Sequence, residues 1–247
     1  MNSCAFFVHD WISQRCLLCG ARSGTRTVCG ACESGLPRLV GSLCRQCATP
    51  IPTPDGTICG ACLTTPPRFD RLIAPYAYVF PVDALIRALK YGGRLVVARF
   101  LASALVPLID EGVDLLVPMP LSDTRLRERG FNQAHEISRH VSRATGVKTE
   151  TRLCRRVRNT VPQAMLPWKA RAQSVRGAFV CDVDLRGARV AVLDDVVTTG
   201  ATLNEVSRVL KRAGASTVTC WSAARTLKHA IRPGGAGPAN LRVSSKA

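Results

Sequence analysis

The sequence is short of aromatic and acidic residues and has no long apolar run. Aromatic side chains make up 5% of the 247 residues, so stacking platforms for nucleic-acid bases would be sparse. The longest apolar stretch, 95–109, is interrupted by Arg99 and is shorter than the roughly 20 residues of a membrane-spanning helix. The first residues lack a basic start, and their apolar run covers only 5–8, which does not resemble a secretory signal. We therefore expect a cytoplasmic protein without membrane insertion.

Acidic residues are outnumbered by basic ones, 17 to 34, which gives a formal charge of +17. Two zinc ions held by eight thiolates would leave about +13, still a bias toward phosphate-bearing partners. Positions 122–190 alone hold 15 basic and 6 acidic residues. An anionic substrate such as pyrophosphate, or a nucleic-acid backbone, would account for this density. Scattered arginines also commonly form a solvated face, so the sequence leaves both interpretations open.

Eight of the 12 cysteines form four Cys-x-x-Cys pairs at nearly regular spacing. The pairs are Cys16/Cys19, Cys29/Cys32, Cys44/Cys47 and Cys59/Cys62. Two such pairs supply the four thiolates of a tetrahedral zinc site, so we expect two structural Zn²⁺ sites. A disulfide framework would need an oxidising compartment, and redox-active pairs of this kind normally stand alone at a helix start. The spacing does not decide which pairs combine.

The pattern of the chain changes near 64–68, where Thr-Thr-Pro-Pro reads as a linker. Residues 1–66 are poor in large aliphatic side chains, and we expect a double zinc ribbon that depends on metal for stability. Residues 67–230 alternate strand and helix patterns, which predicts an α/β domain with a doubly wound, mainly parallel sheet. The expected helices are 83–90, 94–110 and 131–145, and the expected strands are 114–118, 178–181, 190–193 and 217–221. The tail 231–247 is predicted to be disordered.

Residues 189–203 read as a buried strand, two acids, a loop of small residues and the start of a helix. The loop offers hydroxyl groups, a glycine that permits close backbone approach, and the free N–H groups of a helix start. Together these groups predict an anion site suited to a phosphate monoester. Its residues are Thr198, Thr199, Gly200, Ala201 and Thr202.

Asp194 and Asp195 come directly before this loop, where their carboxylates would repel a phosphate at contact distance. Vicinal sugar hydroxyls and a divalent cation such as Mg²⁺ are the partners that suit them. A phosphorylated ribose satisfies both halves of the pattern. An ordinary strand end followed by a helix N-cap is the alternative, and it would be the favoured one for an isolated Asp-x-x-Thr.

This stretch resembles the signature by which type I phosphoribosyltransferases bind phosphoribosyl diphosphate (PRPP). The resemblance implies that Asp194 and Asp195 are catalytic and that the loop holds the 5′-phosphate. Residues 117–122 resemble the pyrophosphate loop of that family, and 158–177 occupy the place of its flexible catalytic loop, in a form similar to amidophosphoribosyltransferases. The residues expected on the pyrophosphate side are Lys90, Pro120, Leu121, Arg158 and Arg171.

With the cysteine pairs and the segments 89–92 and 129–133 added, nearly the whole chain resembles the ComF/GntX family. That family joins a zinc ribbon to a phosphoribosyltransferase domain, and its ComF members are associated with DNA uptake in natural transformation. The resemblance implies a glycosyltransferase that moves a pentosyl group with Mg²⁺ and releases pyrophosphate. The alternative is a non-catalytic PRPP- or nucleotide-binding module that engages single-stranded DNA and competence or DNA-processing proteins. Purine-salvage members carry an acid where this chain has Thr198, which disfavours purine salvage.

Overall fold

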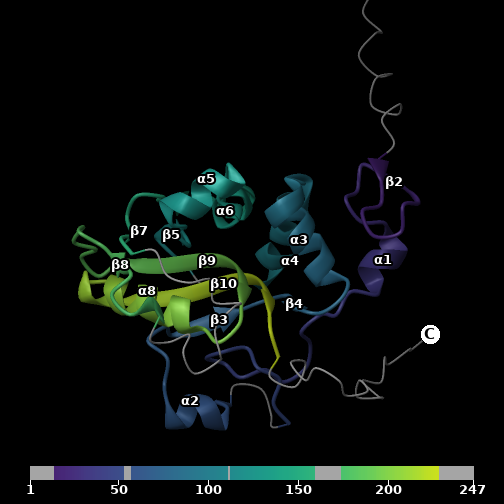
Figure 1. Cartoon of the computed structure of the whole chain (residues 1–247). Coiled ribbons are helices and arrows are strands. Elements are labelled where there is room, and N and C mark those ends of the chain that lie inside the picture. Colours follow the sequence, from purple (N-terminus) through teal and green to yellow (C-terminus); the bar gives the residue numbers. More distant parts are fainter. Residues whose placement is uncertain (1–13, 53–56, 111, 159–173, 228–247) are drawn as a thin grey trace, which may run out of the picture.

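A mainly parallel sheet organises the computed structural model, which describes residues 14–52, 57–110, 112–158 and 174–227 (Figure 1). Its strands lie in the order β3-β10-β9-β5-β6, and β4 also pairs with β10; every one of these pairings is parallel. The strands are β3 (Arg71–Ile73), β4 (Tyr76–Ala77), β5 (Leu115–Pro118), β6 (Lys148–Thr149), β9 (Arg189–Val197) and β10 (Thr217–Arg225). The strand that carries the two acids, β9, therefore lies in the middle of the sheet.

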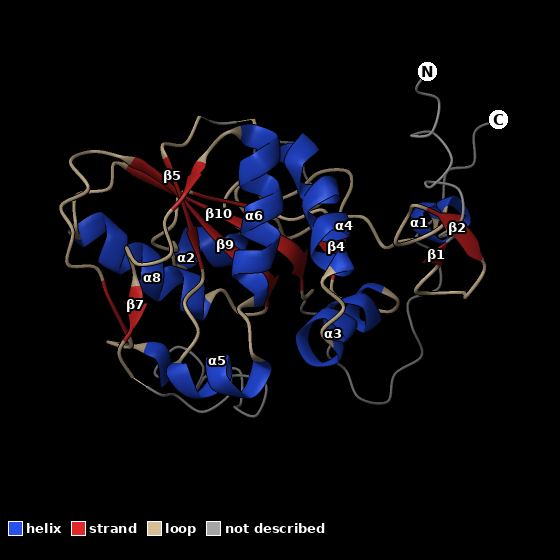
Figure 2. Cartoon of the chain, turned by 90° about the horizontal axis from the view of Figure 1, so that it is seen from above, coloured by secondary structure: helices blue, strands red, loops and turns tan. Residues whose placement is uncertain are grey.

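Helices cover both faces of this sheet (Figure 1). One face carries α3 (Val82–Gly92), α4 (Val96–Leu105) and α6 (Gln133–Thr145), and the other carries α8 (Ala201–Arg212). The short helix α5 (Asp123–Arg129) lies between β5 and α6 in the chain and buries no residue. Seen from above, α4 and α6 lie side by side, and they are in contact (Figure 2). A strand covered on both faces must be apolar throughout, which explains the buried run of residues 190–193 in β9.

The fold class predicted from the sequence is therefore confirmed. The described chain has the doubly wound, mainly parallel sheet of the type I phosphoribosyltransferase fold, preceded by a zinc ribbon. Among the described residues, no helix is both long and apolar enough to cross a bilayer. The predicted tail, 231–247, lies outside the described residues.

Three predicted elements differ from the observed ones. The helix expected over 94–110 ends at Leu105 and continues as a 3₁₀ turn, Val106–Leu108, because Pro107 has no N–H to donate to the preceding turn. The strand expected over 178–181 is the short β8 (Phe179–Val180), which pairs antiparallel with β7 (Arg155–Arg156) outside the main sheet. Strand β9 does not end at the two acids but continues to Val197.

The first ribbon unit packs against α4. It contains β1 (Gln14–Arg15), β2 (Arg22–Gly24) and α1 (Gly30–Ser34). The Thr27 hydroxyl donates to the Val96 carbonyl at 3.3 Å, and the Arg99 guanidinium donates to the Thr25 carbonyl at 3.3 Å. Val28 is buried in the same apolar cluster as the sheet residues. This unit is therefore part of the main core.

The second ribbon unit, which contains α2 (Gly60–Thr64), contacts the chain near the end of the sheet. The Gln46 amide donates to the Phe69 carbonyl at 3.4 Å, and the Arg225 guanidinium donates to the Thr49 hydroxyl at 3.0 Å. The predicted boundary at 64–68 stays a prediction. The segment directly after it is held in place, because the Arg68 backbone N–H donates to the Asn204 side chain at 2.5 Å.

Candidate functional site

The cysteine array closes into two separate clusters of four. One is formed by Cys16, Cys19, Cys29 and Cys32, and the other by Cys44, Cys47, Cys59 and Cys62, with all sulfurs of a cluster within 4.8 Å of one another. The Cys19–Cys29 and Cys47–Cys59 sulfur distances are both 3.7 Å. A tetrahedral site with Zn–S bonds of about 2.3 Å has edges of about 3.8 Å, so both clusters fit zinc. The first pair combines with the second, and the third with the fourth.

Backbone N–H groups prepare one thiolate in each cluster. Burial opposes the charged form of Cys16, but N–H donors led by that of Cys29, 3.3 Å from the sulfur, lower the pKa of Cys16 to about 6. In the same way burial opposes the Cys44 thiolate, but the Cys59 N–H, also at 3.3 Å, leads the donors that lower the pKa of Cys44 to about 7. Metal-bound cysteines must be deprotonated, so these contacts favour metal binding.

Away from the ribbon, the carboxylate of Asp195 is buried and ion-paired. Asp195 is only 3% exposed, and its Oδ2 lies 2.5 Å from Lys90 Nζ on α3. Lys90 thus neutralises the charge of this buried carboxylate. Asp194 is half-buried, and its Oδ1 accepts a 2.8 Å hydrogen bond from the Asp195 N–H. Sequence reasoning named both acids and Lys90, and the structure brings Lys90 onto Asp195.

The two carboxyl groups have opposite pKa shifts. Burial, followed by the neighbouring Asp195 carboxylate, raises the pKa of Asp194 to about 8. Burial also disfavours the charged form of Asp195, but the Lys90 ammonium outweighs it and lowers the pKa of Asp195. The Lys90 ammonium is likewise opposed by burial, and the Asp195 carboxylate raises its pKa. Near neutral pH the site thus holds a Lys90–Asp195 ion pair beside a largely protonated Asp194.

The loop of residues 198–202 joins β9 to α8, and all five residues are half-buried. Gly200 is the N-cap of α8 and has a φ of 78°, in the left-handed region that favours glycine. The Thr199 hydroxyl accepts from the Ala201 N–H at 3.1 Å, which tightens the turn. A Cβ at Gly200 would lie 3.8 Å from the Phe69 ring. The loop therefore presents the start of the 12-residue helix α8 a few residues after the two acids.

The loop after β5 lies beside the same end of β9. Pro118 pairs with Leu193, and the Met119 N–H donates to the Leu193 carbonyl at 2.8 Å. The Asn132 side chain donates to the Met119 carbonyl at 3.0 Å and accepts from two N–H groups at the start of α6. Pro120 and Leu121, predicted on the pyrophosphate side, are half-buried in this loop. Asn132 thus fixes both the loop and the helix that follows.

Arg129 and Arg156 are two residues near the carboxylates to which sequence reasoning gave no site role. The Arg129 guanidinium lies 5.3 Å from the centre of the Tyr91 ring, next to Lys90 in the chain, and its charge contributes to lowering the pKa of Asp195. Burial, then the nearby Arg125, lowers the pKa of Arg156, while Asp194 acts in the opposite direction. Arg129 and Tyr91 lie in the segments 129–133 and 89–92, which carry the resemblance to the ComF/GntX family. Their contact shows that these two segments meet, so the resemblance already marked Arg129.

Of the two remaining residues predicted on the pyrophosphate side, only Arg158 belongs to the part of the chain that the structure describes. Arg158 lies beside Gly177, and its guanidinium donates to the Arg176 carbonyl at 3.3 Å. Arg171 lies outside the described residues. The roles of Arg158 and Arg171 therefore stay predictions.

Residues 10–63 match the double zinc ribbon domain family. The chain is similar to competence protein F of Haemophilus influenzae, at 31% identity over 168 residues, which are 64% of this chain and 73% of that protein. DNA utilization protein YhgH of Salmonella typhi is 33% identical over 167 residues, which are 64% of this chain and 74% of that protein. An adenine phosphoribosyltransferase structure from Thermoanaerobacter pseudethanolicus is 17% identical, covering 57% of this chain and 73% of that one, with a TM-score of 0.35.

Proposed function

Because the chain belongs to the ComF/GntX family, the family of competence protein F, we propose that it binds PRPP with Mg²⁺ and transfers the phosphoribosyl group to an acceptor, releasing pyrophosphate. Its proposed role is in DNA uptake during natural transformation. The zinc ribbon has a structural part in this proposal, since each cluster supplies four cysteine ligands and leaves no open coordination position.

The single observation that carries the proposal is the acid pair on the central strand, a half-buried Asp194 and a buried Asp195, with Asp195 three residues before a helix-start anion loop. Ligands of open α/β sheets bind at the carboxyl ends of the strands, which is where Asp195 and Thr198 lie. The loop suits a phosphate group, and the carboxylates suit the hydroxyls of a sugar. One sugar phosphate would occupy both at once.

The residues present also fit Mg²⁺ bound together with PRPP. Mg²⁺ prefers carboxylate and phosphate oxygens, and Asp194 and Asp195 place two carboxyl groups on the central strand just before the anion loop. Asp194 and Asp195 would hold the ion or the ribose hydroxyls. The ion would supply charge neutralisation for the departing pyrophosphate.

In the proposed reaction the bond between ribose C1 and the pyrophosphate oxygen breaks, and the electron pair leaves with pyrophosphate. Positive charge develops on the ribose while an acceptor nucleophile forms the new bond to C1 and gives up its proton. The 198–202 loop would hold the 5′-phosphate, and the cations Lys90 and Arg129 would stabilise negative charge on the leaving side. The loop after β5, which Asn132 positions, would border the same group.

Calorimetric titration of Mg²⁺ and PRPP into the zinc-loaded chain tests binding, and pyrophosphate release with a panel of acceptors tests turnover. We expect the Kd for PRPP to rise at least tenfold in Asp195→Asn. Asp184→Asn is the matched control, because its carboxylate is 70% exposed and pairs only with Arg186 among the described residues. Absence of PRPP binding to the wild-type chain would overturn the proposal.

A second candidate function is the non-catalytic module that binds PRPP or a nucleotide and engages single-stranded DNA or competence proteins. The charge of +17 favours it, and two relatives carry the names competence protein and DNA utilization protein. Contacts to the phosphates of the nucleic acid would make the affinity for an oligonucleotide fall steeply between 50 and 200 mM salt, by about 10³-fold or more for six such contacts. PRPP binding without pyrophosphate release, together with this salt dependence, would favour the module over the enzyme.

A further inference from the structure

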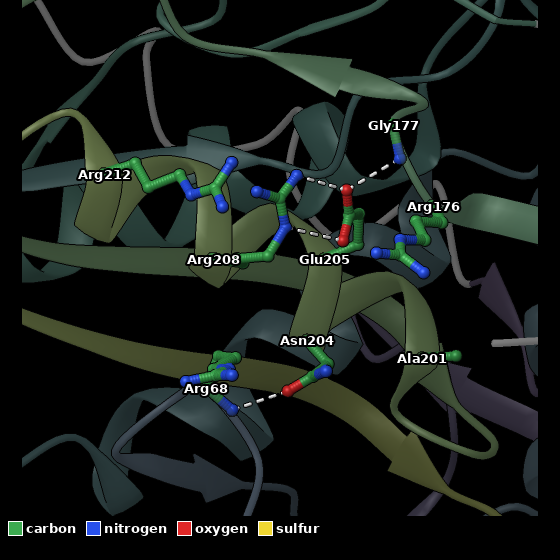
Figure 3. Close-up of a pocket in the computed structure, with 8 residues that line it drawn as sticks. All are labelled: Arg68, Arg176, Gly177, Ala201, Asn204, Glu205, Arg208 and Arg212. Atoms are coloured by element: carbon green, nitrogen blue, oxygen red, sulfur yellow. Dashed lines mark hydrogen bonds and ion pairs between the residues drawn. The ribbon is translucent and has the colours of Figure 1, made fainter. Parts of the chain in front are cut away.

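A pocket of about 470 Å³ lies along α8, away from the acid pair (Figure 3). Its lining residues are Arg68, Arg176, Gly177, Ala201, Asn204, Glu205, Arg208 and Arg212. Of the residues proposed above to bind PRPP, only Ala201 borders it. Arg176 and Gly177 come from the end of the 158–177 segment, but none of Asp194, Asp195, Lys90 and Arg129 lines the pocket, so it needs a separate explanation.

Its four arginines come from three separate segments of the chain. Arg68 precedes β3, Arg176 precedes β8, and Arg208 and Arg212 are one turn apart on α8. Figure 3 shows Arg208 and Arg212 extending from α8 on one side of Glu205, with Arg176 on its other side. Segments this far apart in sequence place their guanidinium groups around one hollow, which is typical of a ligand site and not of a solvated face.

Only one carboxylate lines the pocket, and its hydrogen bonds are already made. Glu205 is 7% exposed and accepts two hydrogen bonds from Arg208, at 2.6 and 2.9 Å, and one from the Gly177 N–H at 2.8 Å. Arg208, followed by other donors and cations, lowers the pKa of Glu205, so it is ionised and neutralises one guanidinium. Within the described residues, Arg68, Arg176 and Arg212 form no salt bridge. The lining thus carries an excess of three positive charges.

We propose that this pocket binds a small ligand with at least two linked phosphate groups, such as inorganic pyrophosphate or a nucleoside diphosphate or triphosphate. Guanidinium groups pair with phosphate oxygens in a two-point geometry, and a pyrophosphate anion matches the excess charge. The volume falls within the range of small-molecule sites. A recessed site of this size favours a compact ligand over the long surface that a nucleic-acid backbone needs. No aromatic side chain lines it, so a base would not be stacked.

The test titrates inorganic pyrophosphate, without Mg²⁺, into the zinc-loaded full chain and its variants. Arg68→Gln/Arg212→Gln removes two unpaired guanidiniums and keeps the Arg68 backbone bond to Asn204 and the Arg208–Glu205 pair. We expect its Kd for pyrophosphate to rise at least tenfold. Arg22→Gln/Arg143→Gln, which removes two exposed arginines elsewhere, should change the Kd less than twofold.

Titration of PRPP with Mg²⁺ separates this site from the proposed PRPP site: Arg68→Gln/Arg212→Gln should keep the wild-type Kd for PRPP, whereas Asp195→Asn should raise it. Zinc content and circular dichroism establish that each variant is folded, and the single variant Arg212→Gln replaces the double one if folding is lost. The proposal would be overturned if the pocket variant and the Arg22/Arg143 control lost affinity for pyrophosphate equally. It would also be overturned if the pocket variant kept the full affinity for pyrophosphate. It would also be overturned if pyrophosphate did not bind while oligothymidylate bound and lost affinity in the pocket variant, because the pocket would then be a nucleic-acid contact.

Discussion

A single lysine determines the charge state of the acid pair. Lys90 reaches Asp195 from α3, and both side chains are largely buried, at 17% and 5% exposed. Among the groups that lower the pKa of Asp195, the Lys90 ammonium comes first and the Arg129 charge is a further one, so without the ammonium burial would shift this pKa upward. Lys90 thus favours the carboxylate form that a cation or a sugar hydroxyl needs.

Lys90→Met should lower the free energy of unfolding at pH 7 by about 3–5 kcal/mol, the usual cost of leaving one partner of a buried ion pair alone. In the wild type the pKa of Asp195 is lowered, so its contribution to stability is lost only as pH falls through the acidic range of that carboxyl group. In Lys90→Met burial should raise the pKa of Asp195, so the variant should regain stability as pH falls from 7 to 5. Urea unfolding should therefore show a smaller difference in the free energy of unfolding between wild type and variant at pH 5 than at pH 7. Lys148→Met, whose side chain is 74% exposed, should change stability by less than about 1 kcal/mol. An equal loss at both pH values would contradict this reasoning.

Asp194 should release a proton when Mg²⁺ and PRPP bind, if it acts as a carboxylate in the complex. With a pKa of about 8, most chains carry this proton at pH 7 and few carry it above pH 9. Calorimetry in buffers of different ionisation enthalpy should show nearly one proton released per site at pH 7 and almost none at pH 9. Asp194→Asn corrects for protons released by the ligand itself. Identical proton release in Asp194→Asn and wild type would contradict a role for the Asp194 carboxylate.

At the scale of helices and strands, the long periodic segments were predicted and the short ones were not. The burial pattern of α3 follows its apolar spacing, and the helix ends at Gly93, which has a φ of 61°. Helix α5 has no buried residue, so no apolar stripe marks it in the sequence. Strand β7 has two residues, too few to show an alternation. The extension of β9 past the acids comes from pairing with β10 through Val197, which a local pattern does not contain.

The Asn132 side chain caps α6 and also holds the loop after β5, and two variants separate these functions. Asn132→Ala removes the α6 cap and the bond to Met119, and should lower stability by about 1–2 kcal/mol and weaken PRPP binding. Asn132→Asp keeps the acceptor for the cap but replaces the amide donor by oxygen. We expect thermal melting to show most of the stability restored in Asn132→Asp, while calorimetry shows PRPP binding still weakened. Recovery of both properties would mean that the Met119 contact does not position the loop.

At the scale of the whole molecule, the two zinc clusters should stabilise more than the ribbon. Val28, Leu36 and Ala48 lie in one buried cluster with the sheet core, so losing the metal should lower the melting temperature of the α/β part as well. We expect two zinc ions per chain in the wild type and one in Cys19→Ser. Cys181→Ser, at a cysteine outside both clusters, should keep two. An unchanged melting temperature of the α/β part after chelation would show that the ribbon folds independently.

The sequence predicted the parts of the site that are close in the chain, and long-range contacts supplied the rest. The acid pair, the 198–202 loop and the cysteine pairs each lie in one segment, so their patterns were readable. The approach of Lys90 to Asp195 and of Arg129 to Tyr91 depends on how α3 and the region after β5 pack over the sheet. The arginine pocket joins three segments, and no local pattern marks it.

The contacts of Phe69 limit how far this protein is modular. Its carbonyl is held by Gln46 of the second ribbon unit, and its ring lies against the Gly200 turn that starts the anion loop. One residue therefore touches both the metal-binding half and the ligand-binding half. Exchanging the ribbon for another small domain would remove the Gln46 contact to Phe69, and with it a support of the loop.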